Sequence, residues 1–284
     1  MKVTRRSALT TFSVLPAMVA ATAVGGQSGG RASSRRPRIG LQLYSVRSEC
    51  ARDLPGVLKA VAGMGYEGVE FAGYYGRSAQ ELRQMLDENR LQCCGTHIPL
   101  NTLQGENLGK TIEFNKVLGN RFLIVPWLPA QQRNSPEACE ATARIFNEIA
   151  KQLEPHGMFV GYHSHADDVK PLPGGETPWD LLFQKMDRRV VMQLDIGNSL
   201  SVGVQAAPIL ARYPGRARTV HVKDYSATND KALLGEGDVP WKEVIPLLQG
   251  KAGTEWYIIE QESYPYPPLV CAEKCLQNWK RLIR

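Results

Sequence analysis

The chain lacks several features that would assign it directly to a common functional class. It has six cysteines but no CxxC pair, so it shows neither the paired thiolates of a structural zinc site nor a spacing that selects disulfide partners. No glycine fingerprint follows the first apolar run, where residues 45–48 read Ser-Val-Arg-Ser. This absence argues against an open, dinucleotide-binding α/β sheet, whose first turn needs glycines around the phosphates.

The body of the chain also lacks an excess of basic residues. The formal net charge is +6 over 284 residues. Residues 1–38 hold seven lysines and arginines and no acid, so residues 39–284 carry a net charge of −1. A dedicated DNA- or RNA-binding domain shows a basic patch, and we therefore expect no nucleic-acid partner.

The N-terminal segment contains the longest apolar stretch, over residues 8–24, which Ser13 and Pro16 interrupt. This stretch is too short and too mild for a stable membrane span. The preceding residues, Thr-Arg-Arg-Ser-Ala-Leu at 4–9, resemble the twin-arginine export signal. We expect a signal peptide over residues 1–26, a flexible leader rich in Gly, Ser and Arg over 27–37, and a periplasmic or extracellular location.

From residue 38 onward, short apolar runs alternate with longer segments of helical periodicity, and there are eight of each. The strands are expected at 39–45, 68–72, 91–97, 122–126, 158–163, 190–195, 218–221 and 256–260. The helices are expected near 53–64, 78–89, 106–118, 136–154, 178–186, 206–213, 241–249 and 268–282. Repeated βα units predict a parallel sheet. Eight units without a linker predict one α/β domain, a (β/α)8 TIM barrel over residues 38–284.

Four consecutive expected strands end on a residue type that binds metals. These residues are His163, Asp195, His221 and Glu260. Each alone could be a hydrogen-bonded structural residue, but neighbouring strands lie about 4.8 Å apart and their ends converge at the barrel mouth. Two imidazoles and two carboxylates suit Mn²⁺, Co²⁺, Zn²⁺ or Fe²⁺. We therefore predict one divalent metal ion at the mouth, where TIM barrels carry their chemistry.

Several motifs together resemble the xylose isomerase-like "sugar phosphate isomerase/epimerase" superfamily, from about residue 38 to the end. They include Ile-Gly-Leu-Gln-Leu-Tyr-Ser-Val-Arg at 39–47, Gly-Tyr-Glu-Gly-Val-Glu at 65–70, Gly-Tyr-His-Ser-His at 161–165, Leu-Asp-Ile-Gly at 194–197, Pro-Gly-Arg at 214–216, His-Val-Lys-Asp at 221–224, Gly-Glu-Gly at 235–237 and Ile-Ile-Glu-Gln at 258–261. The motifs are specific for the superfamily and weak for any one substrate.

The resemblance implies a barrel whose metal is held by Glu, Asp, His and Glu on successive late strands. Asp195, His221 and Glu260 match the last three ligands, whereas His163 stands where the family has its first Glu. In the epimerases the two glutamates exchange the substrate proton, so here Glu260 is the remaining candidate base. His165, two residues after His163 and on the same strand face, could share or replace it as a ligand.

Other residues near the expected strand ends are candidates for contact with a sugar. Lys223 could neutralise a developing oxyanion, or form an ion pair with a neighbouring acid. The candidate substrate-binding residues are Glu70, His97, Tyr44, Trp127 and Glu236. The aromatic members could offer an apolar face to a sugar ring, or pack at the rim.

These residues predict an exported, metal-dependent sugar isomerase or epimerase that abstracts a proton next to a carbonyl or hydroxyl of a small carbohydrate. One alternative is a 3-keto-glycoside lyase that eliminates across C1–C2, with His165 protonating the leaving group. Another is a non-catalytic carbohydrate-binding barrel that retains the metal, which would show no proton exchange from D₂O. An apurinic endonuclease would need more metal ligands than five histidines supply, and a gel shift at low salt would detect it.

Overall fold

The computed structural model describes Met1 and residues 36–284. The expected signal peptide and most of the leader fall on residues 2–35 and lie outside the described part. Within that part, every helix is too short or too polar to cross a membrane.

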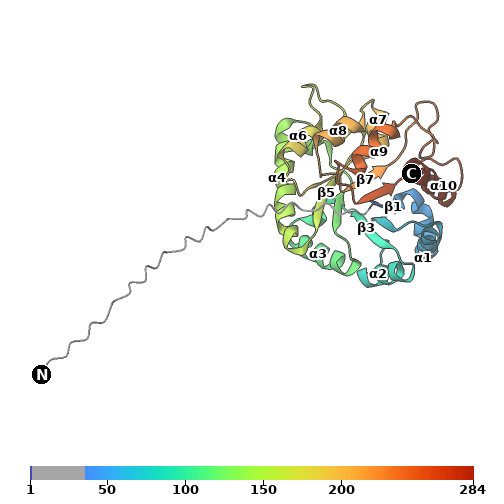
Figure 1. Cartoon of the computed structure of the whole chain (residues 1–284), viewed down its shortest axis with the longest axis horizontal. Helices are drawn as coiled ribbons and strands as arrows, with labels where there is room; N and C mark the ends of the chain where they lie inside the picture. The colour runs from blue at the N-terminus through green and yellow to red at the C-terminus, as the bar shows by residue number, and fades with distance from the viewer. Residues whose placement is uncertain (2–35) are drawn as a thin grey trace. The chain divides into compact units, whose positions relative to one another are not determined.

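Eight parallel strands form the centre of the domain (Figure 1). They are β1 (Arg38–Gln42), β2 (Gly68–Ala72), β3 (Gln92–His97), β4 (Phe122–Val125), β5 (Phe159–His163), β6 (Val191–Gln193), β7 (Thr219–Val222) and β8 (Trp256–Ile259). Their order is β6-β5-β4-β3-β2-β1-β8-β7. A parallel bridge between Asp195 and His221 connects the two outer strands. The predicted (β/α)8 barrel is thereby confirmed.

The helices surround the strands, as Figure 1 shows. The α-helices are α1 (Arg47–Met64), α2 (Ala79–Glu88), α3 (Glu106–Leu118), α4 (Pro136–Leu153), α5 (Ala166–Val169), α6 (Pro178–Lys185), α7 (Ile196–Ser201), α8 (Ala206–Arg212), α9 (Trp241–Gln249) and α10 (Pro268–Leu282). The 3₁₀ helices are η1 (Leu43–Val46), η2 (Leu100–Leu103), η3 (Ala130–Gln132) and η4 (Glu154–His156). The short helices α5 and α7, which the sequence did not predict, directly follow β5 and β6.

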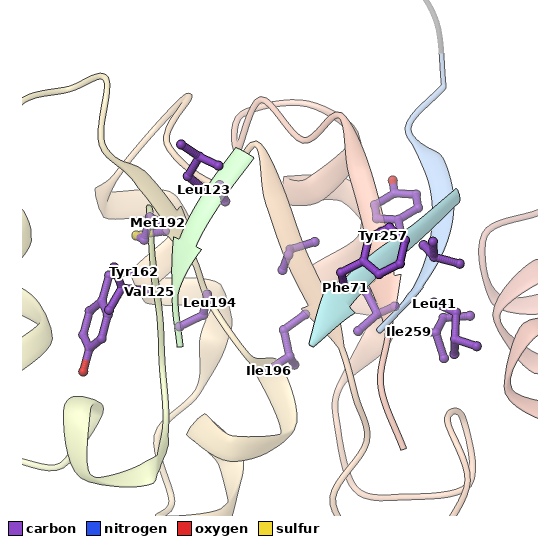
Figure 2. Close-up of a cluster of buried hydrophobic side chains, with 14 of the residues drawn as sticks. Leu41, Phe71, Leu123, Val125, Tyr162, Met192, Leu194, Ile196, Tyr257 and Ile259 are labelled. Carbon is purple, nitrogen blue, oxygen red and sulfur yellow. The ribbon is translucent and has the colours of Figure 1, made fainter. Parts of the chain in front are cut away.

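Two apolar layers stabilise the barrel. The larger layer joins the outward face of the strands to the helices, and Figure 2 shows part of it, including Phe71, Tyr162 and Tyr257. The smaller layer contains strand residues only and fills the inside of the barrel; its members are Cys94, Phe122, Ile124, Val191, Trp256 and Ile258. A barrel plugged in this way is a closed core, so a ligand can approach only at its ends.

The period-two alternation of side chains places the polar residues above this plug. Val191 and Ile258 lie inside the barrel, so the residues two and four positions later on the same strand face also point inward. This register brings Gln193 and Asp195 in from β6 and Glu260 in from β8. The mouth is therefore lined by polar side chains that follow directly on an apolar interior.

A β-bulge in β3 changes this register. The pairing with β2 shifts between Val69 and Glu70, so that Gly95 rather than Cys94 is the partner of Glu70. Bulges re-aim side chains near functional sites, and here the bulge turns His97 inward to contact Glu70 and Gln193. A methyl group on Gly95 would lie 2.4 Å from Oε1 of Glu70, which explains why glycine occupies this position.

The first expected strand, 39–45, was predicted too long. β1 ends at Gln42, whose side chain accepts a hydrogen bond from the backbone of Tyr44 (3.0 Å) and begins the 3₁₀ turn η1. The first helix also begins at Arg47 instead of residue 53, and it contains a kink at Asp53 (φ −153°, ψ 77°). Asp53 lies two residues before Pro55, whose ring disfavours a regular helix just before it.

Candidate metal centre

Four side chains from the ends of β5 to β8 meet at the barrel mouth, and we name them the strand-end cluster: His163, Asp195, His221 and Glu260. One ligand-type atom of each lies within 4.8 Å of those of the others. All four residues are buried. The structure therefore brings together the four residues that the strand ends singled out.

Glu70 fixes the orientation of the His221 ring. Nε2 of His221 donates to Oε2 of Glu70 (2.7 Å), and Nδ1 of His221 lies 3.0 Å from Oε2 of Glu260 and 3.9 Å from Oδ2 of Asp195. A carboxylate behind a histidine selects the tautomer and increases the basicity of the opposite nitrogen. Nδ1 of His221 is therefore the atom that can bind a cation together with the two carboxylates.

Gln193 performs the equivalent role for two other imidazoles. Its Oε1 accepts from Nδ1 of His163 (3.1 Å) and from Nε2 of His97 (2.8 Å). Its Nε2 donates to Oε1 of Glu70 (2.8 Å) and to Thr219 (3.0 Å). Because Nδ1 of His163 carries the proton, Nε2 of His163 is free to bind a cation.

Asp195 meets the cluster with one carboxylate oxygen. Oδ1 accepts from the backbone N–H of Asn198 (2.7 Å) and caps α7, as expected for an Asp at an N-cap. Oδ2 is buried and has no hydrogen-bond partner among the described residues. An unpartnered buried carboxylate oxygen is costly, and a cation held with Glu260 and the two histidines would satisfy it. The donor set thus fits the predicted divalent metal.

The charges of the cluster are strongly coupled. Burial lowers the pKa of His163 well below its usual value, and the neighbouring imidazoles lower it further. Burial also disfavours charged His221, but Glu260 and Glu70 outweigh this effect and raise the pKa of His221 to about 10. Burial raises the pKa of Asp195 to about 7, against the attraction of Lys223. Without a divalent ion, the protonated ring of His221 is therefore the positive group that faces the carboxyl groups of Asp195 and Glu260.

Two further candidates lie beside the cluster. Lys223 forms an ion pair with Glu262 and donates to Oδ1 of Asn198 (3.2 Å). Its pKa is raised because Asp195, Glu260 and Glu262 outweigh the effect of burial. His165 stands at the rim with its ring centroid 5.0 Å from that of His163. Loss of hydration lowers the pKa of His165 and so favours its neutral form.

Three predicted substrate-binding residues lie at the surface, and no described contact joins them to the cluster. Tyr44 is 43% exposed and stacks against the Arg47 guanidinium (4.4 Å to the ring centroid). Trp127 is 59% exposed. The carboxylate of Glu236 accepts from the backbone of Leu233 (3.2 Å). Glu70 differs from them because it is fully buried and its carboxylate contacts the rings of His221 and His97.

Sequence reasoning missed two glutamines of this site. Gln193 precedes Asp195 by two residues, so strand alternation alone would have placed it on the inner face. Gln42 ends β1 and donates to Oε2 of Glu70 (2.7 Å). Glutamine is not a usual catalytic residue, so only the position of a polar side chain on the inward face of a strand could have indicated that these two residues belong to the site.

Several known proteins resemble this chain in sequence or in fold. The inosose dehydratase of Salmonella agona (strain SL483) is 26% identical over 160 residues, which cover 49% of this chain and about half (52%) of the relative's length. A sugar phosphate isomerase/epimerase from Parabacteroides distasonis superposes with a TM-score of 0.73 at 22% identity, over 89% of this chain and 97% of the other. The IOLI protein with a bound zinc atom superposes with a TM-score of 0.67 at 12% identity, covering 87% and 98%. These two structural likenesses show the shared fold.

The family assignment follows from a match over most of the barrel. The model of the xylose isomerase-like TIM barrel family matches residues 58–281. This range includes all strands from β2 to β8 and the whole strand-end cluster. The chain belongs to the xylose isomerase-like TIM barrel family.

Proposed function

We propose that the chain is a divalent-metal-dependent enzyme that removes a proton from a carbon next to a carbonyl group of a carbohydrate. The observation that carries the proposal is the strand-end cluster, with its two carboxylates, two imidazoles and the unpartnered Oδ2 of Asp195. His163, Asp195, His221 and Glu260 would hold Mn²⁺, Co²⁺, Zn²⁺ or Fe²⁺. Such an ion supplies Lewis-acid stabilisation of negative oxygen beside the reacting carbon.

The proton acceptor is better matched by His165 than by Glu260. Burial raises the pKa of Glu260, but His221 and Lys223 outweigh it and lower this pKa to about 2, which makes its carboxylate a weak base. A general base works best when its pKa lies near the operating pH. His165 carries an imidazole at the exposed rim, and loss of hydration lowers its pKa, which favours the neutral form that can accept a proton. Lys223 adds positive charge next to the two carboxylates.

Elimination is the second candidate outcome, and one observation favours it. The carboxylate of Glu70 lies on the far side of His221 from Glu260 and already accepts hydrogen bonds from Gln42, Gln193 and His221. Glu70 therefore cannot act as a second base opposite Glu260, as a symmetric exchange of the substrate proton between two glutamates would require. In an elimination, His165 would take the proton from carbon, the C–O bond one carbon further would break, and the imidazolium would return that proton to the leaving oxygen. The inosose dehydratases are named for a reaction of this type.

Deuterium exchange tests the proposal. The chain, loaded with Mn²⁺ or Zn²⁺, is incubated in D₂O with a panel of ketohexoses and inososes, and proton NMR follows the C–H next to each carbonyl. We expect exchange on at least one compound. His165→Gln should slow exchange by about 10²-fold or more while metal content stays the same, whereas Asp195→Asn should lose metal and exchange together.

The outcomes separate the alternatives. Ultraviolet absorbance of a conjugated enone would identify elimination, and an aldose product would identify isomerisation. Exchange at the parent rate in His165→Gln would contradict the assignment of the base. The absence of exchange across the whole panel by metal-loaded protein would contradict the enzymatic proposal and leave a metal-containing binding barrel. Export by the twin-arginine route stays a prediction, which N-terminal sequencing of secreted protein would test.

A further inference from the structure

A cavity of about 540 Å³ lies between the loops that follow the cluster residues His221 and Glu260. Residues 223–230 and 232, after β7, and residues 261–263, after β8, line it. Lys223 and Glu262 each follow a cluster residue by two positions, which is about 6.6 Å of extended chain. A substrate whose reacting carbon lies at the cluster would therefore extend into this loop cavity.

Asp224 holds one wall of the loop cavity in place. Its Oδ1 accepts from the backbone N–H groups of Tyr225 (2.9 Å) and Val239 (3.2 Å). Its Oδ2 accepts from the backbone of Gly235 (2.7 Å) and from the indole of Trp241 (2.9 Å). Asp224 is only 8% exposed. A buried carboxylate with four donors fixes the loop after β7, so the cavity is a built feature and not a chance gap.

Gln261 ties the second wall to the first. Its side-chain amide donates to the backbone carbonyls of Ser263 (2.7 Å) and Ala232 (3.2 Å). Its backbone N–H donates to Oγ of Ser45 (3.0 Å). The loops after β7 and β8 are thus joined through one side chain that is 6% exposed.

The charge of the loop cavity disfavours a phosphate group. Its charged lining residues are Lys223, Asp224, Asp230 and Glu262, which sum to a net charge of −2. The one cation among these lining residues, Lys223, is already paired with Glu262. A dianionic group would meet net repulsion and find no free ammonium. Hydroxyl and amide side chains make up much of the remaining lining, and they include Ser226, Thr228, Asn229 and Ser263.

The size of the loop cavity exceeds that of a single sugar ring. A volume of 540 Å³ corresponds to roughly 18 water molecules at about 30 Å³ each. A hexose has about 12 heavy atoms, so this volume leaves room for more than one sugar ring. A polar lining whose one cation is already paired suits hydroxyl groups in particular.

We propose that the loop cavity is a subsite for a neutral, hydroxyl-rich group attached to the reacting ring, so that the substrate is a glycoside-sized carbohydrate and carries no phosphate in this cavity. This inference rests on the proposed function for the position of the reacting ring. The cavity itself consists of residues outside the strand-end cluster, and its binding can therefore be measured separately.

Calorimetric titration of the full chain tests the subsite with defined probes. Maltose, cellobiose and trehalose represent neutral disaccharides, D-glucose represents one ring, and D-glucose 6-phosphate represents one ring with a dianion. We expect at least one disaccharide to bind about tenfold or more tightly than glucose, and glucose 6-phosphate to bind no more tightly than glucose. The same order should persist in Asp195→Ala, because the subsite does not need the metal.

Two variants sharpen the result. Ser263→Trp should fill the loop cavity and abolish the preference for the disaccharide, whereas Gln277→Trp, exposed on α10, should retain it. Asp230→Lys should strengthen glucose 6-phosphate binding about fivefold and leave disaccharide binding unchanged. If no disaccharide binds more tightly than glucose, or if glucose 6-phosphate binds best in the parent, the inference fails even when the metal is present. If the parent chain binds a disaccharide but takes up no metal on reconstitution, the subsite is upheld and only the proposed metal-dependent reaction is contradicted.

Discussion

Replacing Glu70 by glutamine tests how the protein positions its metal ligands. Glu70 is fully buried, and its two oxygens accept from Gln42, Gln193 and His221. A glutamine of the same shape must place an N–H₂ group where one of these donors now points. The conflict is relieved only if a neighbouring amide turns over, for example that of Gln193.

Such a turn of Gln193 would change a metal ligand. Its amide nitrogen would then face Nδ1 of His163, which now donates to Oε1 of Gln193 (3.1 Å). His163 would have to move its proton to Nε2, the nitrogen that is free for a cation. In addition, His221 would lose the negative partner that raises its basicity. Loss of such outer partners costs about 10- to 100-fold in metal affinity, or about 1.4–2.7 kcal/mol.

Competition titration with a chromophoric chelator measures the effect. We expect Glu70→Gln to bind Zn²⁺ or Mn²⁺ with an affinity about 10- to 100-fold lower than the parent, with the same far-ultraviolet circular dichroism. Glu148→Gln is the matched control, because Glu148 is exposed on α4, and it should bind like the parent. Equal affinities in all three proteins would refute the view that Glu70 sets the orientation of the metal-binding histidine.

Three further predictions concern packing, a buried cation and pH. Gly95→Ala pushes a methyl group against Glu70 (2.4 Å), and it should lower the free energy of unfolding in urea by about 1–3 kcal/mol. Gly109→Ala, in an open helical position of α3, should raise that free energy by about 0.5–1 kcal/mol. A Gly95→Ala protein as stable as Gly109→Ala would contradict this reasoning. Arg216 donates to three backbone carbonyls at 2.6, 2.7 and 3.3 Å. Arg216→Ala should therefore lower the free energy of unfolding in urea by about 2–5 kcal/mol, and a loss below about 1 kcal/mol would be inconsistent with those hydrogen bonds. Because the pKa of His221 without a cation is about 10, a metal ion must displace its proton to bind. Metal affinity should therefore rise about tenfold per pH unit between pH 7 and 9, and calorimetry in two buffers should show proton release. Metal affinity that does not change with pH would contradict the assignment of His221 as a ligand.

The strand alternation explains why much of the candidate site could be predicted. His163, Asp195, His221 and Glu260 each stand on the inward face at the end of a strand, and four neighbouring strands must converge in a closed barrel. No long-range information beyond closure is needed for this inference. The positions of helices such as 106–118 and 268–282 were likewise predictable, because their apolar periodicity and end residues agree.

The supporting contacts could not be predicted, because they depend on departures from regular alternation. The bulge at Gly95 turns His97 inward and makes space for Glu70, and nothing in the strand pattern signals it. The four donors around Asp224 come from residues up to seventeen positions further along the chain. Loop closure of this kind depends on tertiary geometry, and so the loop cavity became visible only in the structure.

The metal content of the purified chain tests the central claim most directly. Plasma mass spectrometry should find about one divalent transition metal per parent chain after reconstitution and dialysis. Asp195→Asn should lose it, because the carboxylate pair is broken, whereas Asp167→Asn, an exposed acid of α5, should keep it. No metal in the reconstituted parent, or full occupancy in Asp195→Asn, would contradict the assignment of the strand-end cluster as a metal centre.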